Sequence, residues 1–278
     1  MAASDQRNGK TSTDDALKRA TAAINRGRAD EAEQIARGVL GKDGRHAGAL
    51  RMLGSALLLQ DRADDAVAPL ESAARALRDP AVDTELAIAL RRAGRDNDAL
   101  SRLKRATKRR PPYAFAFHEL GFLLFSLRRF DEAVSAVHCG MEVAPFMPDL
   151  PTLLGGILHA RHDHAGAKAA YSRALSIAPD HPGARFGMGT GLMEQAAFAP
   201  AAEHFRFAAL NNPNDLQVRL KLGACLLELG QTASALACLR AAVRNGAPGA
   251  YGMSLRVLLS SGRGRFWLQP SRAMQSLS

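Results

Sequence analysis

Small and large apolar residues recur along the chain with a period of about 34 positions. Aligned on a small residue that follows an acidic pair or its equivalent, seven copies stand in register, at spacings of 34, 33, 34, 34, 34 and 34. The aligned residues are Ala32, Ala66, Ala99, Ala133, Ala167, Ala201 and Ala235. A register that holds over seven copies indicates an internal repeat and predicts one elongated repetitive structure rather than ordinary globular domains.

Two more small positions accompany each aligned alanine. Twelve residues upstream stand Ala20, Gly54, Ala87, Gly121, Gly155, Gly189 and Gly223. Seven residues downstream stand Val39, Ala73, Ala106, Gly140, Ala174, Ala208 and Ala242. Large apolar residues between them fall at helical spacing, which predicts two amphipathic helices in each repeat, joined by a turn at a glycine or a charged pair. We expect the first-helix glycine and the second-helix alanine to mark the helix crossing, since small side chains permit close approach.

A proline in the same register closes four repeats, at Pro111, Pro145, Pro179 and Pro213. Proline has no N–H and disfavours helical geometry in the preceding residue, so we expect it to end the second helix. This pattern resembles the tetratricopeptide repeat, most closely from Phe117 to Pro145, and the resemblance covers residues 13 to 249. It implies an all-α fold, a right-handed α-solenoid of about seven stacked antiparallel helix pairs with a C-terminal capping helix.

The register also predicts the boundaries of the chain's parts. Residues 1–12 are predicted to be a disordered polar tail, and residues 250–278 a capping helix and C-terminal tail. In that tail, Phe266, Trp267 and Leu268 either fold back on the cap or form a docking motif. Pro69 falls inside a second helix and predicts a bent or late-starting helix. The seven repeats are predicted at 13–46, 47–79, 80–113, 114–147, 148–181, 182–215 and 216–249.

Composition excludes several classes of protein. With 47% hydrophobic and 23% charged residues, the chain is folded rather than disordered. Three cysteines make a disulfide framework improbable and favour a reducing compartment. No apolar run is long enough for a transmembrane segment, and no secretory signal is visible at the N-terminus. These features predict a cytoplasmic protein.

The resemblance implies that the first helices line a concave groove that holds a peptide or a partner helix. Phe115, Phe122 and Phe125 share one face of a helix, and such aromatic clusters are typical of binding hot spots. The alternative is that Phe122 and Phe125 pack into neighbouring repeats. The predicted groove residues are Arg91, Phe115, His118, Phe122, Phe125, Thr152, His159, Phe186, Thr190 and Met193.

The net charge of +10 is concentrated in two places, the stretch 91–110 and the C-terminal 29 residues. Residues 91–110 carry nine basic side chains against two acidic ones. Such a stretch is either a solvated face or a site for an anionic partner, such as an acidic protein, a membrane surface or nucleic acid. The candidate patch comprises Arg92, Arg95, Lys104, Arg105, Lys108, Arg109 and Arg110.

No catalytic, cofactor-binding or metal-binding residues are predicted. His159, His162 and His164 form a cluster at a turn, but the only further ligand nearby is Asp163, whose side chain is expected to point elsewhere. They are interpreted as solvated turn histidines. Neighbouring His138 and Cys139 point about 100° apart on a helix, so they cannot form a nucleophile and base pair.

The sequence therefore predicts a non-enzymatic scaffold or adaptor that binds a peptide or helix of a partner protein in the groove of repeats three to six. One alternative is a module recruited to an anionic surface or nucleic acid through the basic stretch. Another is a regulatory or substrate-presenting subunit of a separate enzyme such as a transferase. Two specialised branches of the family use a carboxylate clamp or a ladder of groove asparagines. The clamp is not expected here, since its asparagine positions carry Thr21, Ser55 and Ile88. The ladder is not expected either, since Asn25 is the one asparagine in the predicted first helices.

Overall fold

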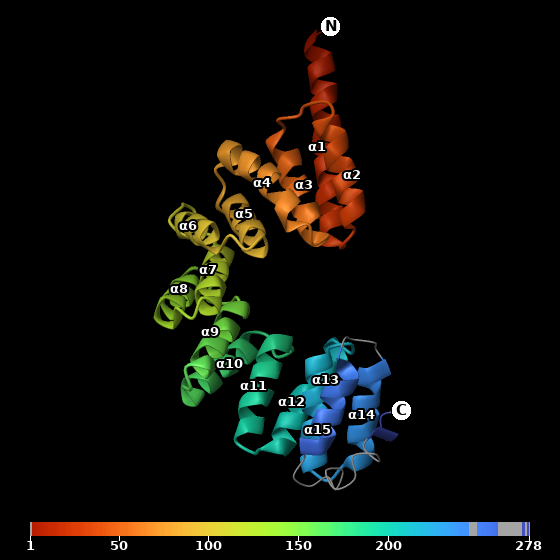
Figure 1. Cartoon of the computed structure of the whole chain (residues 1–278). Coiled ribbons are helices and arrows are strands. Elements are labelled where there is room, and N and C mark those ends of the chain that lie inside the picture. Colours follow the sequence, from red (N-terminus) through yellow and green to blue (C-terminus); the bar gives the residue numbers. More distant parts are fainter. Residues whose placement is uncertain (1, 245–248, 261–273, 276, 278) are drawn as a thin grey trace. The chain divides into compact units, whose positions relative to one another are not determined.

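The computed structural model describes residues 2–244, 249–260, 274–275 and 277, with side chains from residue 13 onwards. Across these residues the chain forms fifteen helices and no strand, so the predicted all-α fold is confirmed. The chain divides into two compact units, Met1–Pro145 and Phe146–Ser278. Figure 1 shows the helices of each unit packed as successive pairs.

Unit 1 contains the first four repeats, and its first helices contact one another. Each second helix packs on the first helix of its own repeat, and α2, α4 and α6 also pack on the first helix of the next repeat. Among the described residues, the second helices of successive repeats do not contact one another. The first helices therefore form an inner layer. The helices are α1 (Ala2–Asn25), α2 (Ala29–Leu40), α3 (Ala47–Leu59), α4 (Ala63–Leu77), α5 (Pro80–Arg92), α6 (Asp96–Ala106), α7 (Ala114–Ser126) and α8 (Phe130–Val143).

Unit 2 contains three further repeats and ends in α15, which packs on both helices of the preceding pair. The predicted capping helix is thereby observed, and its Leu258 is completely buried. Phe266, Trp267 and Leu268 lie outside the described residues. The helices are α9 (Asp149–Ala160), α10 (His164–Ile177), α11 (Pro182–Glu194), α12 (Phe198–Asn211), α13 (Leu216–Glu228), α14 (Thr232–Arg244) and α15 (Ala250–Ser260).

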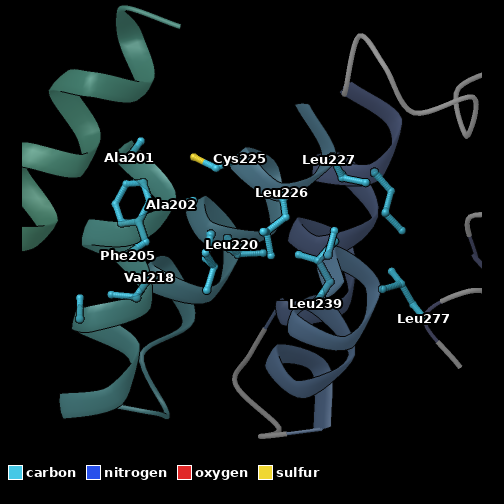
Figure 2. Close-up of a cluster of buried hydrophobic side chains, with 14 residues drawn as sticks. Ala201, Ala202, Phe205, Val218, Leu220, Cys225, Leu226, Leu227, Leu239 and Leu277 are labelled. Atoms are coloured by element: carbon cyan, nitrogen blue, oxygen red, sulfur yellow. The ribbon is translucent and has the colours of Figure 1, made fainter. Parts of the chain in front are cut away.

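The core of unit 2 is a cluster of interlocking side chains from α12 to α15 (Figure 2). Phe205 of α12 is fully buried and packs against Phe186 of α11, and Leu239 of α14 is fully buried in the same cluster. Leu258 and Leu277 extend the cluster at its C-terminal side. Burying the last repeat in this way removes the apolar face that a terminal repeat would otherwise expose to water.

Four of the aligned first-helix glycines lie opposite a large second-helix residue sixteen positions later, namely Gly54, Gly155, Gly189 and Gly223. A Cβ at Gly54 would stand 2.4 Å from Leu70, and one at Gly223 would stand 2.7 Å from Leu239. The aligned alanines are themselves almost completely buried. Glycine therefore makes room for a large apolar side chain where the two helices cross.

The turn inside every repeat contains one residue with a positive φ. Gly94 and Gly230 were expected there, but Ala196 adopts the same left-handed conformation with φ 56°. The turn falls at the same register position in every repeat, because every second helix begins three residues before its aligned alanine. The residues concerned are Gly27, Asp61, Gly94, Arg128, His162, Ala196 and Gly230.

The helix ends follow the predicted stop signals, with three differences. Helices α8, α10 and α12 end two residues before Pro145, Pro179 and Pro213, whereas α6 ends at Ala106, well before Pro111. Helix α4 starts in the ordinary place and contains Pro69, so the late start is not seen. Helix α1 begins at Ala2 and includes residues 2–12, which the pattern assigns to a disordered tail. No proline interrupts these residues, so each added residue extends a nucleated helix at little further cost.

None of the described helices combines the length and the apolarity that crossing a lipid bilayer requires.

Candidate binding surfaces

The inner layer of unit 1 carries an ion pair between the first helices of its second and third repeats. The Arg51 guanidinium on α3 donates to the Glu85 carboxylate on α5, with Nη2 2.6 Å from Oε1 and Nε 3.1 Å from the same oxygen. Ser55 Oγ donates to Glu85 Oε2 at 3.0 Å. The hydrogen bond from Arg51 to Glu85 raises the pKa of the arginine. These contacts join α3 to α5 and orient both charged groups.

The next pair of first helices is joined by an arginine that lies over an aromatic ring. The guanidinium carbon of Arg91 on α5 is 4.9 Å from the centre of the Phe122 ring on α7. Arg91 Nη2 is also 3.5 Å from Oε2 of Glu119, a carboxylate that is only 7% exposed. Phe122 remains 38% exposed. The structure thus holds a cation and a partly exposed aromatic ring together on the inner layer.

The other two phenylalanines of α7 have different neighbours. Phe115 stacks on His118, with ring centroids 5.6 Å apart and the planes 6° from parallel. His118 Nδ1 is in turn 3.2 Å from Oε1 of Glu119. Phe125, by contrast, contacts Phe130 at the start of α8, with ring centroids 6.0 Å apart. Phe125 therefore packs within its own repeat, while Phe115 and Phe122 lie beside polar partners.

In unit 2, the predicted groove residues are engaged in packing and local hydrogen bonds. Phe186 packs edge-on to Phe205, with ring centroids 5.8 Å apart, and Met193 packs against the same core cluster. Thr190 Oγ1 donates to the Phe186 carbonyl at 2.9 Å. Thr152 Oγ1 donates to a backbone carbonyl one turn earlier at 2.8 Å. These contacts stabilise the repeats, and Phe186 is only partly exposed, whereas Phe122 of unit 1 is 38% exposed.

A glutamate that the sequence pattern did not suggest joins the histidine cluster of unit 2. Glu194, the last residue of α11, lies 3.2 Å from Nε2 of His159 and 3.8 Å from Nδ1 of His164. One ligand atom from each of the three residues falls within 4.8 Å of the others. Two imidazoles and a carboxylate are ligands that Zn²⁺ accepts, so these are the described residues that could hold a metal ion. Asp163 instead caps α10, because its Oδ1 accepts a hydrogen bond from the Gly166 N–H at 2.8 Å.

The basic stretch surrounds a buried carboxylate. Asp83 on α5 has no exposed surface, and Arg105 and Arg109 of the following segment reach it from outside. Arg105 Nη2 is 2.8 Å from Oδ1, and Arg109 Nε is 2.7 Å from Oδ2. Arg102 Nη1 lies 3.7 Å from Oδ1. A buried carboxylate requires such partners, so part of the basic stretch has a structural role.

The remaining basic residues of the candidate patch do not contact Asp83 in the described structure. Lys108 and Arg110 are exposed. The others have separate partners, namely the Leu58 carbonyl for Arg92, Asp98 for Arg95 and Glu132 for Lys104.

A cleft of about 410 Å³ opens beside the buried carboxylate, between α4 and α6. It lies where successive second helices do not touch. Apart from one alanine, its lining is made entirely of arginines, three from the basic stretch and two from the end of the preceding repeat. We call this the arginine cleft, and its lining residues are Ala74, Arg75, Arg78, Arg102, Arg105 and Arg109.

Comparison with known proteins supports the repeat assignment. A sequence model described as tetratricopeptide repeat matches residues 17–80 and 186–250. No curated protein matches the sequence.

Three solved structures share the fold at low sequence identity. A chain of the APC/C hetero-tetramer Cut9–Hcn1 superposes with a TM-score of 0.71 at 14% identity, covering 86% of this chain. The present chain spans about half of that protein, 48% of its length. TTC0263, a thermophilic TPR protein of Thermus thermophilus, matches with a TM-score of 0.57 at 23% identity, over 65% of this chain and 99% of that one. Pseudomonas aeruginosa PilF matches with a TM-score of 0.61 at 18% identity, over 82% and 98%.

Proposed function

Because this chain is a tetratricopeptide repeat protein, we propose that it is a non-enzymatic scaffold that binds a peptide segment of a partner protein on the inner layer of unit 1. The binding surface comprises the first helices α5 and α7, with the ion pair between α3 and α5 beside it. A stack of helix pairs presents its first helices as one continuous surface, which suits an extended or helical segment.

The partly exposed ring of Phe122 is the observation that carries this proposal. Only 5% of the residues are aromatic, and Phe122 leaves 38% of its surface uncovered on the inner layer. Aromatic and arginine side chains dominate the binding energy of protein interfaces, and Arg91 lies over this ring. Glu119 holds Arg91 from the same helix as the ring, so the pair is oriented before a partner arrives.

The chemistry of this surface indicates what a partner segment must supply. An apolar side chain would cover the exposed part of Phe122, and a backbone carbonyl would accept from Arg91. The flanking charges largely compensate one another, because Arg51 pairs with Glu85 and Arg91 with Glu119. We therefore expect a partner segment with an apolar anchor and little net charge, whose binding depends only weakly on salt.

Site-specific photocrosslinking tests the location of the partner. A photoreactive phenylalanine analogue is introduced at position 122 in the full chain, and at position 146 as a control. Phe146 is 83% exposed but lies in the loop before α9, outside the first helices. We expect one protein to crosslink in high yield from position 122 and not from position 146. Equal yields from both positions would contradict the proposal.

Affinity measurements with the crosslinked partner, purified, provide the quantitative test. Phe122→Ala should weaken binding about tenfold or more, as truncation of a hot-spot residue does. Phe146→Ala should leave the affinity unchanged. Circular dichroism on both variants establishes that the helices are intact, so that a loss of binding is assigned to the surface. An unchanged affinity in Phe122→Ala would overturn the assignment.

A further inference from the structure

The arginine cleft is formed by two repeats that are adjacent in unit 1. Arg75 lies in the last turn of α4, and Arg78 is the residue that ends this helix, with a left-handed φ of 52°. Arg102 and Arg105 come from α6, and Arg109 from the segment after it. The cleft therefore depends on the stacking of repeats two and three, and no single stretch of sequence contains it.

The charges in this cleft are not balanced by the protein. Five guanidinium groups line it, and no acidic residue does. Asp83, the carboxylate that three of these arginines contact, is fully buried and neutralises one of them. The Arg78 side chain forms no hydrogen bond or ion pair among the residues that the structure describes, and the Arg75 side chain donates only to the Ser72 hydroxyl, at 3.2 Å. Like charges gathered in this way repel one another unless an anion binds among them.

The buried carboxylate also orients two of the arginines. Arg105 contacts Asp83 through Nη2 and Arg109 through Nε, so each guanidinium keeps other N–H donors free for a second acceptor. The Arg105 side chain is 51% exposed although it is held at one end. If the arginines of the cleft only stabilised the fold, those that contact Asp83 would be enough. Such a role does not explain why Arg75 and Arg78 also line the cleft.

We propose that the arginine cleft binds the phosphate group of an anionic ligand. A phosphate has several strong acceptor oxygens and a charge near −2, and arginine recognises it through paired N–H donors. The volume of about 410 Å³ lies within the range of ligand sites and accommodates a phosphate with part of the group that carries it. The lining contains no aromatic ring, so nothing in it would stack on nucleic acid bases.

Calorimetric titration of the full chain with pyrophosphate tests this proposal directly. Ionic strength is held constant with sodium chloride, so that general screening does not change during the titration. We expect saturable binding with one site per chain. Absence of binding would overturn the proposal. So would binding that disappears when sodium chloride replaces another salt at the same ionic strength, because chloride would then compete as well as pyrophosphate does.

Substitutions locate the site. Arg78→Gln and Arg102→Gln each remove one guanidinium and leave the two closest contacts of Asp83 in place, so both should weaken pyrophosphate binding about tenfold or more. The matched controls are Lys108→Gln and Arg110→Gln, which remove the same charge from the same basic region outside the cleft. If all four variants weaken binding equally, the effect is one of net charge and the cleft is not a site.

Two further titrations identify the source of the phosphate. The affinity for a phosphoserine peptide is compared with the affinity for the same peptide without phosphate. The affinity for inorganic phosphate alone gives the reference for both ligands. Tighter binding of the phosphopeptide indicates a phosphorylated protein, whereas tighter binding of pyrophosphate indicates a small phosphate-bearing molecule. Both outcomes support a phosphate site. Binding to anionic vesicles or to single-stranded DNA with no response to pyrophosphate would contradict it.

Discussion

At the scale of single residues, the packing within each repeat depends on pairs in which a glycine leaves space for a large side chain of the facing helix. Tyr171 is the extreme case, because it stands where the other repeats have alanine, valine, leucine or phenylalanine. A Cβ at Gly155 would lie 2.5 Å from its ring, and a Cβ at Gly187 would lie 2.3 Å from it. The ring is thus enclosed by two helices, and burial raises the pKa of the Tyr171 hydroxyl to about 12.

Gly187→Ala should lower the free energy of unfolding by about 2 kcal/mol, because the buried ring cannot move away from the new methyl group. Combining it with Tyr171→Leu should recover part of that loss, since the shorter side chain leaves room. Urea unfolding of the single and double variants measures this coupling. Gly191→Ala in the same helix is the control, because open space surrounds its Cβ position. That substitution should be neutral or stabilising, and a loss equal to that of Gly187→Ala would contradict the steric explanation.

Asp83→Asn tests the buried carboxylate that two arginines contact. The amide cannot neutralise Arg105 and Arg109, and we expect the free energy of unfolding to fall by about 2 kcal/mol. Asp98→Asn is the control in the same repeat, since its pair with Arg95 is about half exposed on both sides. Exposed pairs contribute little, so the control should change stability by about 0.5 kcal/mol or less. Equal effects from the two substitutions would show that the burial of Asp83 is unimportant.

At the scale of the elements, the turn between the two helices of a repeat has a fixed conformation but not a fixed residue. Three of the seven left-handed positions hold glycine, and the others hold Asp61, Arg128, His162 and Ala196. A residue with a Cβ is strained in this conformation by about 1 kcal/mol or more. The helices on either side therefore enforce the turn, since they must pack against each other.

Ala196→Gly should accordingly raise the free energy of unfolding by about 1 kcal/mol, because glycine adopts a φ of 56° without strain. Ala199→Gly, three residues later in the first turn of α12, is the matched control and should lower it by a similar amount. Thermal unfolding of the two variants and the unmodified chain gives the comparison. A destabilising effect of Ala196→Gly would mean that the turn is not strained.

At the scale of the whole molecule, each described helix contacts only helices that are near neighbours in the described part of the chain. Within each unit, contacts join the two helices of a repeat and the helices of adjacent repeats. Stability in such a structure is a sum of repeat and interface terms, so a local defect should spread over neighbouring repeats and no further.

Leu239→Ala and Leu70→Ala test this locality, because the two residues occupy the same register position in different units. Both are fully buried, and each substitution should cost about 2 to 5 kcal/mol locally. Hydrogen exchange on the full chain should then accelerate in α12 to α15 for the first variant and in α3 to α5 for the second. Uniform acceleration throughout the chain in either variant would contradict the nearest-neighbour description.

Much of the fold was predictable from the sequence because its determinants are local. The spacing of Ala66 and Gly54 within one repeat decides where two consecutive helices cross, and prolines such as Pro145 stop a helix through their own backbone chemistry. The seven helix pairs and the cap at α15 follow from that pattern. The binding surfaces were predictable only in part. Phe122 was identified as a groove residue, but Phe125 on the same predicted face packs against Phe130 instead.

The sequence by itself determined the repeat, the helices and the placement of positive charge in the stretch 91–110. Only the tertiary structure decided which of those charges meet. It brings Arg105 and Arg109 to a carboxylate 22 and 26 residues earlier, and it places Arg75 and Arg78 in the same cleft. The physical reason is range. Helix and turn formation depend on residues a few positions apart, whereas a cleft between second helices depends on how two whole repeats stack.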